Sequence, residues 1–180
     1  MCGAPTCAAQ TPKYAAAPDP PTQVITANNF CCTEWCLSRA GNAGYWRGRS
    51  LELAGVAAKL ARDAAAAAAR PVLVAGSLPP LRESYQVQGL VAFEEMQAQY
   101  HDLVTWLRPH CDLLLCETLS TATEGLAAGT AASASGLPWW LSYTIEDSED
   151  GEPCLRSGEP LQVGWGRGSA AAACRRCCLR

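Results

Sequence analysis

The stretch Val72-Leu73-Val74-Ala75-Gly76-Ser77-Leu78-Pro79-Pro80 decides the fold class of this 180-residue chain. Its first four residues are a continuous apolar run, which is typical of a strand buried on both faces. Gly76, Ser77 and the two prolines end that run sharply. Three other segments have the composition of strands: residues 23–26, 112–116 and 139–144. Helical patterns lie between the strands, at residues 50–69, 90–107 and 123–133.

Strands and helices therefore alternate along the chain. This alternation, at a spacing of about 30 to 40 residues, is the βα signature of an α/β fold with a parallel sheet and crossover helices. A doubly wound sheet that binds dinucleotides would carry a Gly-x-Gly-x-x-Gly turn, and the sequence has none. The alternative is a (β/α)8 TIM barrel, which takes ~250 residues. With about four strands, the chain predicts a partial barrel with parallel strands and outer helices.

Composition narrows the class of protein. Hydrophobic residues make up 49 % of the chain and the net charge is −3, so no basic field is present to hold nucleic acid. No apolar run reaches the ~20 residues of a membrane helix. Eleven cysteines without a secretory signal pattern indicate mostly free thiols in a reducing compartment. We therefore expect an intracellular, cytoplasmic protein without nucleic-acid or membrane partners.

Residues 1–21 contain five prolines and predict a disordered leader. Order is expected to begin with the strand at residues 23–26, and the ordered domain is expected to span residues 22–161. The remaining 19 residues, 162–180, carry three of the cysteines.

Candidate binding residues follow the ends of the predicted strands, where parallel α/β folds gather their chemistry. Glu117 closes the third strand and is suited to an ammonium group or to a base role, although it would equally complement the dipole of the next helix. Gly76 and Ser77 close the second strand, where Gly allows close backbone approach and Ser offers a hydroxyl; an ordinary turn is the alternative. Asn28 and Thr144 end the first and fourth strands, and both residue types also serve as plain turn or satisfied polar groups.

The cluster of cysteines at Cys31, Cys32 and Cys36 has the composition of a soft-metal site. A zinc site needs a second group of ligands, and the next one lies more than a hundred residues on, at Cys174, Cys177 and Cys178. Free cysteines that pack as small apolar residues are the competing interpretation. The sequence therefore assigns no metal ligand and no catalytic residue.

Several of these segments, in this order, resemble the homocysteine S-methyltransferase family. They are QVITANNF (23–30), LAGVAAKLARDA (53–64), VAGSLPP (74–80), CDLLLCETL (111–119), PWWLSYT (138–144) and LRSGEPL (155–161). The resemblance covers residues 22–161 and identifies them as a partial homocysteine-binding barrel domain. As an ordered set the motifs are far more specific than any one of them alone.

The resemblance implies transfer of a methyl group from S-methylmethionine or S-adenosylmethionine to the thiol of L-homocysteine, giving methionine. It implies zinc as the cofactor, which holds the substrate thiol as a thiolate. By motif match, Glu117 corresponds to the family's contact with the homocysteine amino group. Gly76 and Ser77 correspond to a loop near that substrate. Homocysteine and a methyl donor are thus the expected partners.

The chain departs from the family pattern at both ends. The family's opening strand with an Asp-Gly-Gly-like turn is missing, and so are its zinc cysteines in Gly-x-Asn-Cys and Gly-Gly-Cys-Cys contexts. Residues 162–180 break the pattern abruptly, which indicates an aberrant or disordered tail of a truncated, alternatively spliced or frame-altered product. Two hypotheses remain: an active methyltransferase, or a catalytically inactive fragment that binds or interacts and self-associates at its open sheet.

Overall fold

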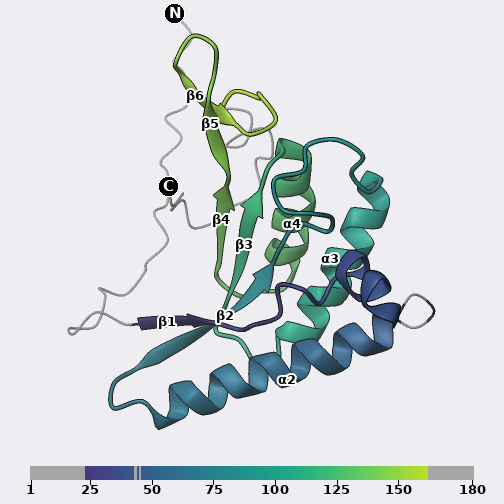
Figure 1. Ribbon diagram of the computed structural model, residues 1–180. Helices are drawn as coiled ribbons and strands as arrows, with labels where there is room; N and C mark the ends of the chain where they lie inside the picture. Colours follow the sequence, from purple (N-terminus) through teal and green to yellow (C-terminus); the bar gives the residue numbers. More distant parts are fainter. Residues whose placement is uncertain (1–22, 43, 45, 162–180) are drawn as a thin grey trace, which may run out of the picture.

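A computed structural model describes residues 23–42, 44 and 46–161 of the chain (Figure 1). The expected leader at residues 1–21 and the expected tail at 162–180 lie outside the described residues.

Four parallel strands form the main sheet, in the spatial order β1-β2-β3-β4 (Figure 1). They are β1 (Gln23–Thr26), β2 (Val72–Leu78), β3 (Leu113–Leu119) and β4 (Trp139–Tyr143). Each pair of neighbours is parallel. The predicted parallel sheet is confirmed, with β2 and β3 longer than expected because both continue through the polar residues at their carboxyl ends.

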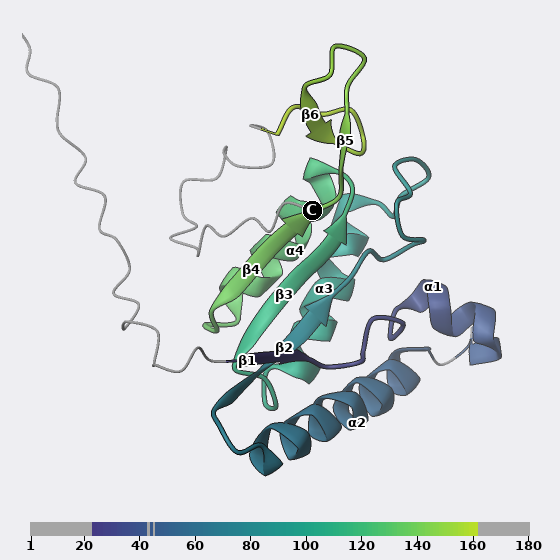
Figure 2. The same cartoon turned by 60° about the vertical axis from the view of Figure 1, so that its left-hand side comes forward.

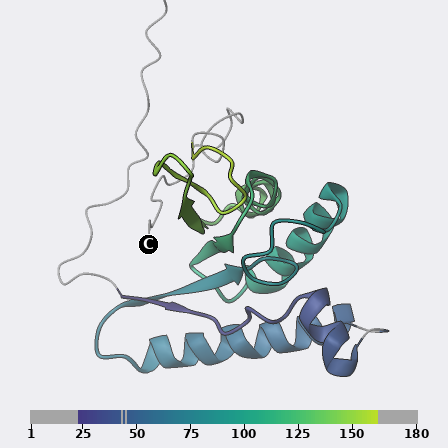
Figure 3. The same ribbon diagram turned by 45° about the horizontal axis from the view of Figure 1, so that its top comes forward.

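The helices lie on one face of this sheet (Figures 2 and 3). They are α1 (Glu34–Leu37), the π-helical turn η1 (Ser38–Asn42), α2 (Trp46–Ala67), α3 (Phe93–Leu107) and α4 (Ala122–Ala134). The three long helices agree with the predicted ones to within a few residues at each end. The short segments α1 and η1 were not expected, because four or five residues are too few to show a helical period.

The hydrophobic core fills the space between these helices and the covered side of the sheet, which we call the outer face. Val74, Leu114 and Cys116 point into it from the strands, and each is 0 % exposed. Tyr100 and Leu107 of α3 meet them there and are also fully buried. Because side chains alternate along a strand, every second residue of β2, β3 and β4 faces the other way.

That other side, the inner face, carries no helix among the described residues. Val24 and Leu73 remain 38 % exposed on it, although both are large and apolar. Leu115 and Trp140 are half-buried. A parallel sheet with helices on a single face is the geometry of a barrel wall, where the inner face meets the opposite wall. The partial-barrel prediction therefore agrees with the layers that the structure shows.

The amino edge of the sheet is held by ion pairing. Asp112 accepts a hydrogen bond from the Val74 backbone N–H at 2.7 Å and lies 3.0 Å from the guanidinium of Arg62 on α2. Arg62 also donates to the His110 carbonyl oxygen. These contacts tie α2 to the start of β3, on the side of the sheet where barrel residues serve stability.

The chain beyond β4 forms a small hairpin that the sequence did not predict. Its strands are β5 (Ile145–Asp147) and β6 (Pro153–Leu155), and they pair antiparallel beyond the carboxyl edge of the sheet (Figure 1). Three-residue strands are too short to give an alternation pattern. No helix in the described part of the chain is long and apolar enough to cross a membrane.

Candidate functional site

Ser77 and Glu117 meet at the carboxyl edge of the sheet, where β1–β4 end. The Ser77 hydroxyl donates a hydrogen bond to Glu117 Oε1 at 2.6 Å. Ser77 is fully buried, whereas Glu117 is half-buried and faces the open side of the sheet. The hydrogen bond fixes one carboxylate oxygen. Oε2 has no hydrogen bond among the described residues and is left for another donor.

Asn29, in the loop after β1, fixes the backbone of Ser77. Its side chain is 0 % exposed and makes two hydrogen bonds to the backbone of Ser77. Nδ2 donates to the Ser77 carbonyl oxygen at 2.8 Å, and Oδ1 accepts from the Ser77 N–H at 3.1 Å. The amide thus replaces a ladder hydrogen bond where β1 has already ended. It links the loop after β1 to the Ser77–Glu117 pair.

The backbone beside Glu117 is strained. Thr118 has a φ of +62°, a conformation that a β-branched residue rarely adopts. The register between β3 and β4 shifts at the same place, between Cys116 and Leu119. Such strain persists where the surrounding structure enforces it, and it gathers at binding sites. Here it coincides with the register shift directly after Glu117.

Thr144 extends the polar edge on the far side of Glu117. Its hydroxyl lies 2.8 Å from the hydroxyl of Ser120, and it also donates to the Leu119 carbonyl oxygen at 3.2 Å. Ser120 leads into helix α4, where Thr121 caps the helix and Glu124 closes a capping box. These hydroxyls continue the row of polar side chains along the carboxyl edge.

Glu124 is a buried carboxylate, 3 % exposed, and its role is structural. Its Oε2 accepts hydrogen bonds from the Ser120 and Thr121 N–H groups, each at 3.1 Å. Burial nevertheless raises the pKa of Glu124, with the nearby Glu159 carboxylate adding to the rise. The Glu124 carboxylate makes its hydrogen bonds at the start of α4 and does not reach the open inner face.

Two of the predicted binding residues occupy different surroundings from Ser77 and Glu117. A Cβ on Gly76 would lie 3.0 Å from Cys111 Sγ and 3.2 Å from Leu107, so this glycine faces the helices and allows α3 to pack closely. Asn28 is exposed at the loop surface, next to the buried Asn29. The two asparagines looked alike in the sequence, and only tertiary packing distinguishes them.

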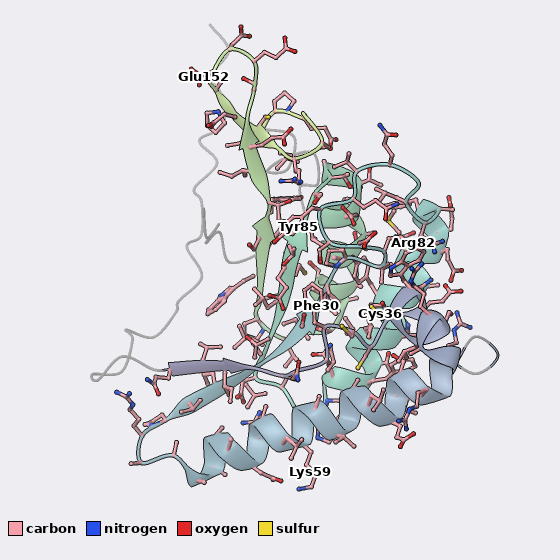
Figure 4. All side chains as sticks on the ribbon, viewed as in Figure 1. Phe30, Cys36, Lys59, Arg82, Tyr85 and Glu152 are labelled. Carbon is pink, nitrogen blue, oxygen red and sulfur yellow. The ribbon has the colours of Figure 1, made fainter. Side chains whose placement is uncertain are left out.

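Aromatic and basic side chains gather beyond the carboxyl edge, as Figure 4 shows for Arg82 and Tyr85 in the loop between β2 and α3. The guanidinium of Arg82 lies 5.1 Å from the ring centroid of Trp35, and that of Arg156 lies 5.0 Å from the ring centroid of Tyr85. These cation–π contacts join α1 and the segment after β6 to the same loop.

The buried thiols are poor nucleophiles. Burial raises the pKa of Cys116 to about 12 and that of Cys111 to about 11, so both stay protonated at neutral pH. Within residues 23–42, 44 and 46–161, no group of three or more His, Cys, Asp or Glu side chains is arranged to hold a metal ion. The described residues therefore do not fit a zinc site. Cys174, Cys177 and Cys178 lie outside them.

The arrangement at the carboxyl edge is suited to binding a small cationic group. Glu117 offers a half-buried carboxylate held by Ser77 and, through it, by Asn29. Hydrogen bonds between a carboxylate and an ammonium group are charge-assisted and strong. The chain is thus a parallel α/β protein with a carboxylate at the edge of the sheet where such folds gather their binding groups.

The chain belongs to the homocysteine S-methyltransferase family, whose model matches residues 13–172. A comparison with curated proteins gives no match.

Solved structures of the homocysteine methyltransferase MmuM from Escherichia coli are similar to this chain. The metallated form matches with 28 % identity and a TM-score of 0.67, covering 79 % of this chain and 52 % of that one. The oxidized form matches with 28 % identity and a TM-score of 0.66, covering 78 % of this chain and 50 % of that one. The apo form matches with 32 % identity and a TM-score of 0.54, covering 66 % of this chain and 44 % of that one. This chain therefore spans about half the length of these enzymes, and its sheet corresponds to part of their barrel.

Proposed function

We propose that the carboxyl edge of this sheet binds L-homocysteine, with the ammonium group of the amino acid on Glu117. The observation that carries the proposal is the chain of hydrogen bonds from Asn29 through Ser77 to Glu117. It holds one carboxylate oxygen and leaves the other toward the open inner face. Membership of the homocysteine S-methyltransferase family supports the choice of amino acid.

Gly76, Asn28 and Thr144 complete the proposed binding edge in different ways. The absence of a side chain at Gly76 lets β2 sit close to α3, which sets the position of Ser77. Thr144 and its partner Ser120 offer hydroxyls to the substrate's polar end. Asn28 lies at the surface of the loop after β1, where it is free to meet a ligand entering from solvent.

The reaction that fits this site is methyl transfer from S-methylmethionine or S-adenosylmethionine. A carbon–sulfur bond forms at the homocysteine sulfur as the donor's carbon–sulfur bond breaks, and the thiol proton is released. In the family, zinc would hold the substrate thiol as a thiolate, but the described residues do not fit a zinc site.

The alternative is that this chain is a catalytically inactive binding module of the family. The lack of a metal-holding cluster in the described part of the chain favours this alternative. Its exposed inner face, with Val24 and Leu73, and its two outer strands favour self-association, since unpaired strand edges invite another chain. The described cysteines are all free, which is consistent with a reducing cytoplasm.

The experiment is a titration of the reduced chain with L-homocysteine, followed calorimetrically. Mercaptobutyric acid, which has the thiol and carboxylate but no ammonium, is the matched ligand control. The proposal expects saturable binding of L-homocysteine and at least tenfold weaker binding of the control. Equal affinity for L-homocysteine and mercaptobutyric acid would show that Glu117 does not bind the ammonium group. A parallel assay of methionine formation with S-methylmethionine, with metal content measured, separates the enzyme from the inactive module.

A further inference from the structure

Cys31 and Cys36 form a pair of thiols that the proposed binding site does not use. Cys31 is exposed in the loop after β1, and Cys36 is half-buried in α1. The Cys36 thiol acts on the Cys31 thiol as a close neighbour. Figure 4 shows Cys36 near the loop that carries Phe30. Two neighbouring thiols, one of them open to solvent, differ from the buried cysteines of the core.

The backbone around Thr33 brings these two residues together. Thr33 is the N-cap of α1, with extended backbone (φ −108°, ψ 161°), and its hydroxyl accepts a hydrogen bond from the Cys36 N–H at 3.4 Å. The chain therefore arrives extended and turns into the helix at Thr33. In a hydrophobic staple the residue just before the cap packs on the fourth helical residue, and here these two are Cys32 and Leu37. Cys31 and Cys36 each lie one position earlier, on the same fold-back of the chain.

We propose that Cys31 and Cys36 are a dithiol site that closes to an intrachain disulfide on reaction with a low-molecular-weight disulfide. The Cys31 thiolate attacks one sulfur of the reagent, forming a mixed disulfide and releasing the first thiol. The Cys36 thiolate then attacks the Cys31 sulfur and releases the second thiol. The two protein thiols lose two protons and two electrons in all, and the reagent gains them.

Exposure makes Cys31 the residue that reacts first. Burial and the neighbouring Cys36 thiol raise the pKa of Cys31, so its thiolate is scarce at neutral pH. The reaction therefore speeds up as the pH rises, by about tenfold per pH unit while the thiol remains mostly protonated. Cys32 lies beside it but is buried, with a pKa raised to about 11, and competes poorly.

The disulfide would restrain the loop that carries Asn29. Cys31 lies two residues after Asn29, whose amide holds Ser77. On the other side, the Cys32 carbonyl oxygen accepts a hydrogen bond from the Ser50 hydroxyl at 2.6 Å. A disulfide between these two hydrogen-bonded points would restrain the loop further. We therefore expect slower amide exchange over residues 27–37 in the oxidised chain.

The test is to incubate the reduced full chain with oxidised glutathione, block the remaining thiols, and digest with trypsin and a Glu-specific protease. Cleavage after Lys13, Glu34 and Arg39 places Cys31 on the peptide 14–34 and Cys36 on the peptide 35–39. The expected product is these two peptides joined by one disulfide, forming faster at pH 8 than at pH 7. Amide exchange over residues 27–37 should slow with it.

Variants decide whether the pair is the one proposed. Cys36→Ser should leave Cys31 as a stable glutathione mixed disulfide, and Cys31→Ser should abolish the linked peptides. Cys154→Ser is the control, because Cys154 is buried in β6 and its thiol donates to the Glu146 carbonyl oxygen; the linkage should be unchanged. A link that persists in Cys31→Ser through Cys32, a link of Cys36 to any other cysteine, or no intrachain link would each overturn the proposal.

Discussion

The Ser77 hydroxyl and the Glu117 carboxylate lie 2.6 Å apart, although 40 residues separate them along the chain. Two parallel strands, β2 and β3, end side by side and bring them together. Parallel sheets place the ends of successive strands on one edge, so residues far apart in sequence become neighbours.

Asn29→Ala should destabilise the fold, whereas Asn28→Ala should not. Removing the Asn29 amide leaves the Ser77 N–H and carbonyl groups buried without partners, at a cost of about 1–3 kcal/mol each before relaxation. Asn28 is exposed, and its truncation should change the free energy of unfolding by less than about 0.5 kcal/mol. Urea unfolding measures both variants. Equal losses of unfolding free energy in the two variants would show that the two hydrogen bonds from Asn29 to Ser77 do not stabilise the fold.

Gly76→Ala should lower the free energy of unfolding by about 1–3 kcal/mol, because the added methyl group would crowd Leu107 and Cys111 in a packed core. Gly55→Ala is the matched control within α2. A Cβ there meets nothing within 4 Å, so the substitution should stabilise the helix by about 0.5–1 kcal/mol. Thermal unfolding of the two variants should thus shift in opposite directions. A neutral Gly76→Ala variant would contradict the close approach of α3.

Glu124 should make the fold less stable as the pH rises above 4.5. Burial raises its pKa in the folded chain above the ordinary value of 4.5, so the folded state holds the proton more tightly than the unfolded state. Its contribution to stability is therefore present at low pH, falls as the pH rises through 4.5, and levels off above the folded pKa.

Glu124→Gln removes this titration and keeps an oxygen to accept the Ser120 and Thr121 hydrogen bonds. The difference in the free energy of unfolding between variant and parent should move in the variant's favour from pH 4 to pH 7. Denaturant unfolding at the two pH values measures it, and the comparison cancels the other carboxylates. A difference that stays constant, or that moves toward the parent, would contradict the raised pKa.

Periodicity and composition were enough to predict the main elements. The apolar runs at residues 72–75 and 112–116 marked buried strands, and the alternation with helices marked a parallel sheet, because burial on both faces leaves that pattern in the residues themselves. The ordered motifs then pointed to the family. The short helix α1 and the β5–β6 hairpin escaped prediction, since segments of three or four residues carry no measurable period.

The details of the candidate site depended on packing that no local pattern records. Ser77 and Glu117 were predicted to share an edge, and the structure places them in contact. The buried partner Asn29 was not distinguished from its neighbour Asn28, because residue type is the same and only burial differs. The positive φ of Thr118 likewise left no trace, since Thr is an ordinary strand residue.

The role of Glu117 in binding the substrate ammonium is tested by comparing L-homocysteine binding to the parent chain, Glu117→Gln and Glu152→Gln. Glu152 is exposed in the β5–β6 hairpin, away from the Ser77–Glu117 pair, and serves as the charge-matched control (Figure 4). Calorimetric titration of the reduced proteins should show binding to the parent and to Glu152→Gln with equal affinity. Glu117→Gln should bind about ten- to a hundredfold more weakly, because the substrate ammonium loses its ionic partner. Parent-like binding by Glu117→Gln would show that the ammonium group does not bind Glu117.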